Sequence, residues 1–176
     1  MIITKALLLC VSYALLAEAM PLVGESTDLV VLLAEKVEGG GTLTVYGAAP
    51  DSAAEAAFTP VLESRQTCGS RTFNCDGSHA PAVGPCSQLI SITRNDPNRV
   101  LSLSPRSICL NSAGTQCCIS WSAPVQNLRQ GSLTSAAQLV LDRCVSDRGQ
   151  SGLTRNTELQ GTCATQCLSN RPDGCN

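Results

Sequence analysis

The chain contains few aromatic side chains, and this limits the core that it can build. Aromatic residues make up 3% of the 176 residues, and residues 66–176 contain only Phe73 and Trp121. Aromatic side chains bury about 150 to 250 Å² each, so a core without them has little margin against the backbone entropy lost on folding, about 1 to 2 kcal/mol per residue. We therefore expect covalent crosslinks to supply part of the stability.

Histidine is nearly absent, and this weakens every hydrolase hypothesis. His79 is the only one, so a Ser-His-Asp set would have to include it, and no G-x-S-x-G sequence presents a serine. We interpret His79 as a surface or cap residue. The carboxylates that a glycosidase would need lie mostly beside turn signals or on the polar face of a helix. They are Asp76, Asp96, Asp142, Asp147, Asp173 and Glu158. We therefore expect that the protein is not an enzyme and has no catalytic residues.

The sequence also lacks the motifs that typically bind phosphate or nucleic acid. The glycines Gly39 to Gly41 lack the lysine and the strand-loop-helix frame of a P-loop. Nine arginines are spread between residues 71 and 171 without a cluster, and only two aromatic residues there could stack on bases. We therefore expect the protein to bind neither a cofactor nor nucleic acid.

No apolar run in the sequence is long enough to span a bilayer as a helix. The longest one lies at the start of the chain. Lys5 precedes the eleven apolar residues 6–16, and Ala17-Glu18-Ala19 has the small-x-small form that signal peptidase cleaves. As a helix, eleven residues rise only about 16 Å, roughly half of a bilayer core. We predict a signal peptide over residues 1–19, cleavage before Met20, a secreted extracellular protein and no transmembrane segment.

Cysteine is plentiful, in contrast to these absences. Cys10 lies in the predicted signal peptide, and an even number remains for an oxidising compartment, which predicts five disulfides. A zinc site would need paired C-x2-C or Cys/His clusters, and the spacing does not supply them, so we expect no metal site. The ten cysteines are Cys68, Cys75, Cys86, Cys109, Cys117, Cys118, Cys144, Cys163, Cys167 and Cys175.

Cysteine and charge divide the mature chain at the same place. Residues 20–65 hold no cysteine and have seven acidic against two basic residues, whereas residues 66–176 have nine arginines, no lysine and six acidic residues. We predict an acidic leader and linker over 20–65 and a cysteine-rich domain over 66–176. Arg65 could be a processing site, although an uncleaved linker fits as well because no dibasic pair is present.

The leader itself contains two β-rich runs. Residues 29–33 and 42–46 flank Gly39 to Gly41, which suggests a hairpin. This hairpin could add to an exposed sheet edge of the oppositely charged domain, an intramolecular contact that should weaken as salt rises, or the leader could remain a solvated arm without a partner.

The domain shows strands and helices in a recognisable order. We predict a strand over 67–75, a helix over 78–92, a hairpin of 107–111 and 116–121, and a helix from Leu133 to Cys144, whose apolar residues recur at helical spacing. Residues 153–159 and 162–168 are extended by propensity. Taken as β-α-β-β-α-β, this order predicts an α+β split sandwich, a four-stranded antiparallel sheet with two helices on one face.

The hairpin register makes a prediction about connectivity. If residues 112–115 form the turn, Cys117 shares the apolar face of Ile119 and Trp121, and Cys109 and Cys118 lie opposite each other on the other face. Cys117 should then pair with Cys86 or Cys144 on a helix. Cys118 should reach Cys109 or the C-terminal tail.

Three stretches carry a resemblance to a known group. SPRSICLNSAGTQCCISWS, LTRNTELQGTC and the tail CLSNRPDGC resemble the secreted cysteine-rich fungal proteins with a WD-like domain, over about residues 66–176. The expected strand-helix-hairpin-helix-strand layout is also similar to fungal killer toxins and necrosis-inducing extracellular effectors. The resemblance implies no known activity and no site residues.

Two functions from different classes remain. One is a secreted effector-like or toxin-like protein, favoured by the killer-toxin layout and the basic domain. The alternative is a structural or cell-wall-associated binding protein without activity of its own, favoured by the low charge and the absence of a site. In both, the partner is an unidentified extracellular one, a cell-surface or wall component.

Overall fold

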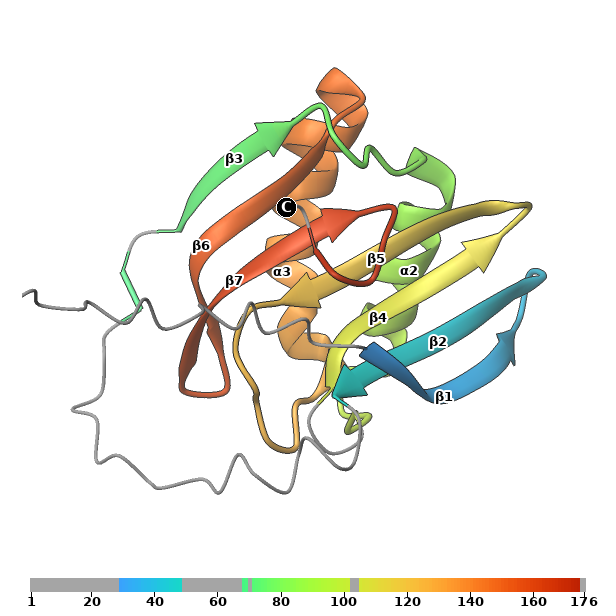
Figure 1. Ribbon diagram of the computed structural model, residues 1–176, viewed down its shortest axis with the longest axis horizontal. Coiled ribbons are helices and arrows are strands. Elements are labelled where there is room, and N and C mark those ends of the chain that lie inside the picture. Colours follow the sequence, from blue (N-terminus) through green and yellow to red (C-terminus); the bar gives the residue numbers. More distant parts are fainter. Residues whose placement is uncertain (1–28, 49–67, 70, 102–104, 175–176) are drawn as a thin grey trace, which may run out of the picture.

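The described residues form one antiparallel sheet of seven strands with two helices packed on it (Figure 1). The computed structural model describes residues 29–48, 68–69, 71–101 and 105–174. The strand order is β1-β2-β4-β5-β7-β6-β3, and every neighbouring pair is antiparallel. The strands are β1 (Leu29–Val37), β2 (Gly41–Ala48), β3 (Thr72–Asp76), β4 (Pro105–Ser112), β5 (Thr115–Trp121), β6 (Ser151–Leu159) and β7 (Thr162–Ser169).

The expected four-stranded split sandwich is wrong. Residues 151–169 form two strands, β6 and β7, joined by a tight turn at Gln160 and Gly161. The predicted β-α-β-β-α-β order allowed only one strand after the second helix. The strands of the leader are part of the same sheet, because β2 pairs with β4. Alternation of apolar residues shows that a run is extended, but it does not show which strands are neighbours.

Both helices lie on one face of the sheet, behind it in Figure 1. α2 (Val83–Asn95) packs against β4 and β5, and α3 (Thr134–Val140) packs against β6 and β7. A 3₁₀ turn (Gln130–Leu133) leads into α3, and a π-helical segment (Leu141–Ser146) continues it. The first helix begins five residues later than we predicted from 78–92, at Val83, just beyond Pro81.

The core lies between the sheet and these helices. The predicted hairpin register is confirmed, since Cys109 faces Cys118 and Leu110 faces Cys117. The side chains that fill the space between the sheet and the helices are almost fully buried. They include Leu89 and Ile90 from α2, Ile108, Leu110 and Ile119 from the hairpin, Val140, and Leu168 from β7.

The leader hairpin closes one edge of the sheet, as the sequence suggested. Gly39 and Gly40 adopt φ of 88° and 86° in its turn, a backbone region that glycine enters without steric cost. From β2, Leu43 and Val45 are buried with exposed fractions of 1% and 2%. The division of the chain at 65/66 stays a prediction, but residues 29–48 share one sheet and one core with residues 72–169.

Candidate functional site: the outer face of the sheet

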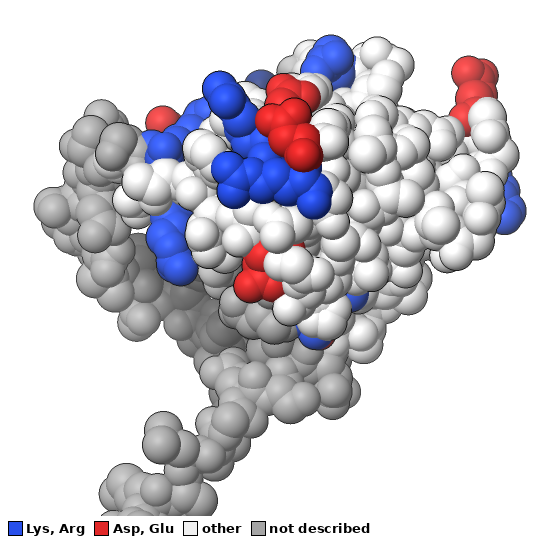
Figure 2. All heavy atoms as spheres, turned by 90° about the horizontal axis from the view of Figure 1, so that it is seen from above, with Lys and Arg blue, Asp and Glu red and all other residues white. Residues whose placement is uncertain are grey.

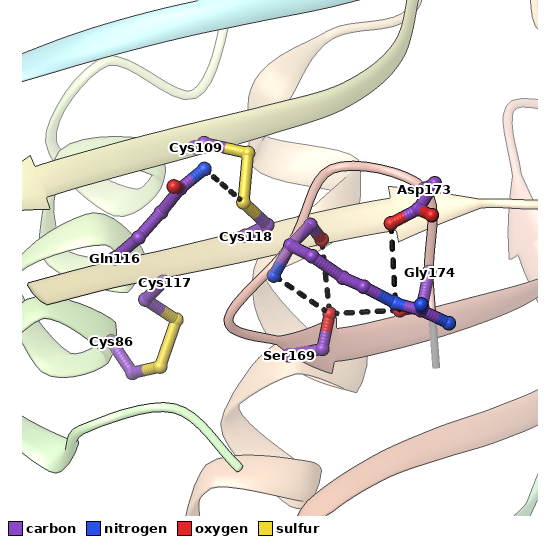
Figure 3. The surroundings of a disulfide bond; sticks show 9 residues. Cys86, Cys109, Gln116, Cys117, Cys118, Ser169, Asp173 and Gly174 are labelled. Carbon is purple, nitrogen blue, oxygen red and sulfur yellow. Dashed lines mark hydrogen bonds and ion pairs between the residues drawn. A yellow bond between two sulfur atoms is a disulfide. The ribbon is translucent and has the colours of Figure 1, made fainter. Parts of the chain in front are cut away.

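The sheet has two faces of different character, which adjacent cysteines of β5 show directly. Cys117 points toward the helices and is bonded to Cys86 of α2, whereas Cys118 points the other way and is bonded to Cys109 of β4 (Figure 3). We call the helix-covered side the inner face and the opposite side the outer face. Cys86 is one of the two partners that the register allowed for Cys117.

The disulfides tie this sheet to both helices and across its strands. Cys75 of β3 is bonded to Cys144 of the π-helical segment, and Cys68 is bonded to Cys163 of β7. Cys167 is disulfide-bonded too, and its partner is none of the other eight described cysteines, which pair among themselves. The only other cysteines in the sequence are Cys10 and Cys175. The sheet and both helices are thus fixed covalently.

The outer face of the three strands β2, β4 and β5 carries no charged side chain among the residues that alternate onto it. Its side chains bear hydroxyl, amide and phenol groups around one disulfide; the two serines and two cysteines among them are buried, and the others are half-buried or exposed. These residues are Thr42, Thr44, Tyr46, Ser107, Cys109, Asn111, Gln116, Cys118 and Ser120.

A groove of about 210 Å³ lies on this face over the three strands. It is lined by Thr42, Thr44 and Tyr46 from β2, Cys109 and Asn111 from β4, and Gln116 from β5, and we call it the β2–β5 groove. Cys109 is buried at its floor, and the other lining residues are half-buried or exposed. The Gln116 amide nitrogen lies 3.1 Å from Cys118 Sγ, so the amide is held against the disulfide (Figure 3).

A second cavity, of about 200 Å³, lies on the outer face where the tail after β7 turns back over the sheet. We call it the tail hollow. Its lining includes two charged side chains, Arg106 and Asp173, together with Ser120, Leu153 and Gly174. The hydroxyls of Ser120 and of Ser107, which faces it across β4 and β5, are buried and have no hydrogen-bond partner among the described residues.

The tail is held in place by its own polar contacts. The Ser169 hydroxyl lies 3.0 Å from the Arg171 carbonyl oxygen and 3.1 Å from that of Gly174. Arg171 Nε donates to the Gly174 carbonyl at 3.0 Å and forms an ion pair with Asp173 (Figure 3). The wall of the tail hollow is therefore a structured loop.

Two of the residues considered for catalysis, Asp76 and His79, lie in one turn at the end of β3. The Asp76 carboxylate accepts a hydrogen bond of 2.6 Å from the Ser78 backbone amide, which lowers the pKa of Asp76, and this contact closes a turn. His79 adopts φ of 55°, and its carbonyl accepts from the Asn170 amide. In the part of the chain that the structure describes, no group of three or more His, Cys, Asp or Glu residues could hold a metal ion.

One ion pair connects the leader hairpin to the rest of the molecule. Both carboxylate oxygens of Glu35 in β1 accept hydrogen bonds from the Arg99 guanidinium, which lies in the loop after α2. These hydrogen bonds lower the pKa of Glu35 and raise that of Arg99, and partial burial opposes both effects. The pair lies on the inner side of the sheet edge, away from the β2–β5 groove.

Charges elsewhere are mixed in sign. On the face shown in Figure 2, basic and acidic side chains lie side by side and most of the surface is uncharged, so this face presents no broad basic surface to a polyanion. Among the described helices, none is long and apolar enough to cross a membrane.

Sequence reasoning missed the groove because half of its lining belongs to the leader hairpin, and the sequence did not show which sheet edge that hairpin joins. The signal was nevertheless present: Thr42, Thr44 and Tyr46 alternate with Leu43 and Val45, so three polar groups share one face of a strand. Which residues of β4 and β5 lie beside them became evident only from the strand order.

Comparison with known proteins gives a family and no closer relative. No curated protein and no solved structure matches this sequence. The family model for the Fungal WD-like domain matches residues 51–175, a range that begins after the leader hairpin. Because this match covers more than half of the chain, the protein belongs to the Fungal WD-like family.

Proposed function

We propose that this protein is a secreted binding protein of the cell surface or wall, without catalytic activity of its own. The observation that carries the proposal is the β2–β5 groove on the outer face, whose lining is polar and holds no charged side chain, on a sheet that disulfides crosslink. A rigid site loses little conformational entropy when a ligand binds, so crosslinks improve a binding surface as well as its stability.

The effector-like alternative remains a second proposal, favoured by the basic balance of residues 66–176. An effector that is secreted in an inactive form would require removal of the acidic leader for its activation. Leu43 and Val45 are buried in the common core, so removal of the hairpin would expose apolar surface as well as release arginines. The likeness to killer toxins depended on the split βαβ order, and that order is wrong.

The test uses the chain that begins at Met20, with its disulfides intact. We expect it to sediment with insoluble fungal cell-wall material and to leave susceptible cells intact, without membrane leakage or growth arrest. The reduced and alkylated protein is the control for nonspecific adsorption. Protein that stays in the supernatant and arrests growth would refute the proposal and favour the effector.

The same preparation tests the disulfide framework that secretion implies. We predict that peptide mapping finds ten cysteines in five bonds, with Cys167 bonded to Cys175, because Cys10 is removed with the predicted signal peptide. A reproducible free thiol in the secreted protein would contradict this.

A further inference from the structure

We propose that the β2–β5 groove binds an uncharged, hydroxyl-rich chain, a neutral polysaccharide. This inference rests on the proposed binding function and names its ligand class. It starts from the absence of charged side chains in the lining: Thr42, Thr44, Tyr46, Cys109, Asn111 and Gln116. Lys36 lies at the rim, where its amine donates to the Thr42 hydroxyl at 2.8 Å.

The lining groups suit a ligand rich in hydroxyl groups because they serve as both donors and acceptors of hydrogen bonds. Threonine hydroxyls and the amides of Asn111 and Gln116 both donate and accept hydrogen bonds. A sugar hydroxyl also does both, so each can be satisfied in either orientation. Neutral groups lose far less hydration free energy on burial than ions do, and an uncharged ligand therefore binds here without an uncompensated charge.

Tyr46 adds the aromatic surface that such a ligand needs. It is half-buried at one side of the groove, opposite Ser107 in the register of β2 and β4. Its ring offers an apolar face and its hydroxyl a polar tip, which suits a molecule with C–H faces and hydroxyl edges. Binding sites commonly combine such a surface with a few placed polar groups.

The groove is crosslinked on one side, and two of its strands are paired along both edges. The Cys109–Cys118 disulfide joins two of its strands, and both β2 and β4 are paired on both sides, so no strand edge is open for an added peptide strand.

The experiment titrates the isotope-labelled chain from Met20 with short neutral oligomers, one of β-linked glucose and one of N-acetylglucosamine. Galacturonate oligomers serve as the charged comparison. We expect the neutral oligomers to shift the amide signals of residues 42–46, 109–111 and 116–120, with affinity nearly independent of salt. Shifts with galacturonate alone, or with no oligomer at millimolar concentrations, would overturn the proposal.

Variants locate the site. Asn111→Ala should weaken binding about tenfold through loss of hydrogen bonds. Asn74→Ala is the matched control, because Asn74 is exposed on the same face at the opposite edge strand β3, and it should leave the affinity unchanged. Tyr46→Ala should also weaken binding, and Tyr46→Phe should retain most of it. Dispersed amide spectra would show that each variant is folded.

Failure of this inference is distinguishable from failure of the proposed function. If Tyr46→Ala and Asn111→Ala proteins sediment with cell-wall material as well as the unchanged protein does, the binding function stands and the groove is not its site. Loss of sedimentation in both variants, with Asn74→Ala unaffected, is the expected result.

Discussion

The two sides of the seven-stranded sheet are held in different ways. The strands β3, β4, β5 and β7 each hold a cysteine that is disulfide-bonded to a neighbouring strand, to a helical segment or to Cys68, whereas the hairpin of β1 and β2 contains no cysteine. The hairpin is attached by the backbone ladder to β4, by Leu43 and Val45 in the core, and by the ion pair of Glu35 with Arg99.

This comparison shows where local opening should begin. No side chain of β1 is fully buried, and Val31 and Leu33 are 57% and 40% exposed on the outermost strand. Regions with few buried apolar contacts open at lower free energy than the core does. Three of the six groove residues lie on β2, so the candidate site joins the less tightly held part of the sheet to the stapled part.

The largest effect should come from a disulfide on the stapled side. Cys75→Ala combined with Cys144→Ala removes a crosslink across a sequence separation of 69 and should lower the free energy of unfolding by about 4 kcal/mol. Urea unfolding at equilibrium measures the change. The comparison variant, Cys109→Ala with Cys118→Ala, opens a separation of only 9 and should lose less than about 3 kcal/mol. Equal losses would contradict the chain-entropy explanation.

On the hairpin side, the largest effect should come from its buried leucine. Leu43→Ala removes a side chain that is 1% exposed and should lower the free energy of unfolding by about 2 to 5 kcal/mol. Thr44→Ala, the next residue and on the outer face, should change it by less than about 0.5 kcal/mol. If the two variants unfold alike, the hairpin does not contribute to the core as described.

Salt should distinguish an apolar attachment from an electrostatic one. The sequence suggested that docking of the leader weakens as salt rises, and we now expect only a small loss, because one partly exposed ion pair responds to screening whereas Leu43 and Val45 do not. Amide exchange of residues 41–48 at low and high salt measures this. Loss of protection at high salt would show that charge holds the hairpin.

The smallest effect concerns Glu35. The pKa of Glu35 is lowered below 4.5 in the folded protein, so its stabilisation is fully present above that pH and is lost as pH falls through the lower folded value. Glu35→Gln should cost about 0 to 1 kcal/mol at neutral pH, since the side chain is 35% exposed. In unfolding at a series of pH values, the difference from the unchanged protein should shrink below about pH 4.5. A difference that is constant with pH would contradict the ion pair.

Some features followed from the sequence because they depend on local pattern. The turn at residues 112–115 set the β4–β5 register, and the register put Cys117 and Cys118 on opposite faces because side chains alternate along a strand. The helical spacing from Leu133 to Cys144 likewise located the second helix, although the structure divides it into 3₁₀, α and π segments. Each of these features requires only neighbours within a few residues.

Other features were decided by the tertiary structure alone. Local pattern could neither place β2 beside β4 nor choose Cys86 over Cys144 for Cys117, since both depend on which distant segments pack together. The groove is of the same kind: its lining comes from residues 42–46, 109–111 and 116, which only the strand order brings into one surface. Local periodicity determines which side of a strand a residue occupies, and long-range packing determines what lies next to it.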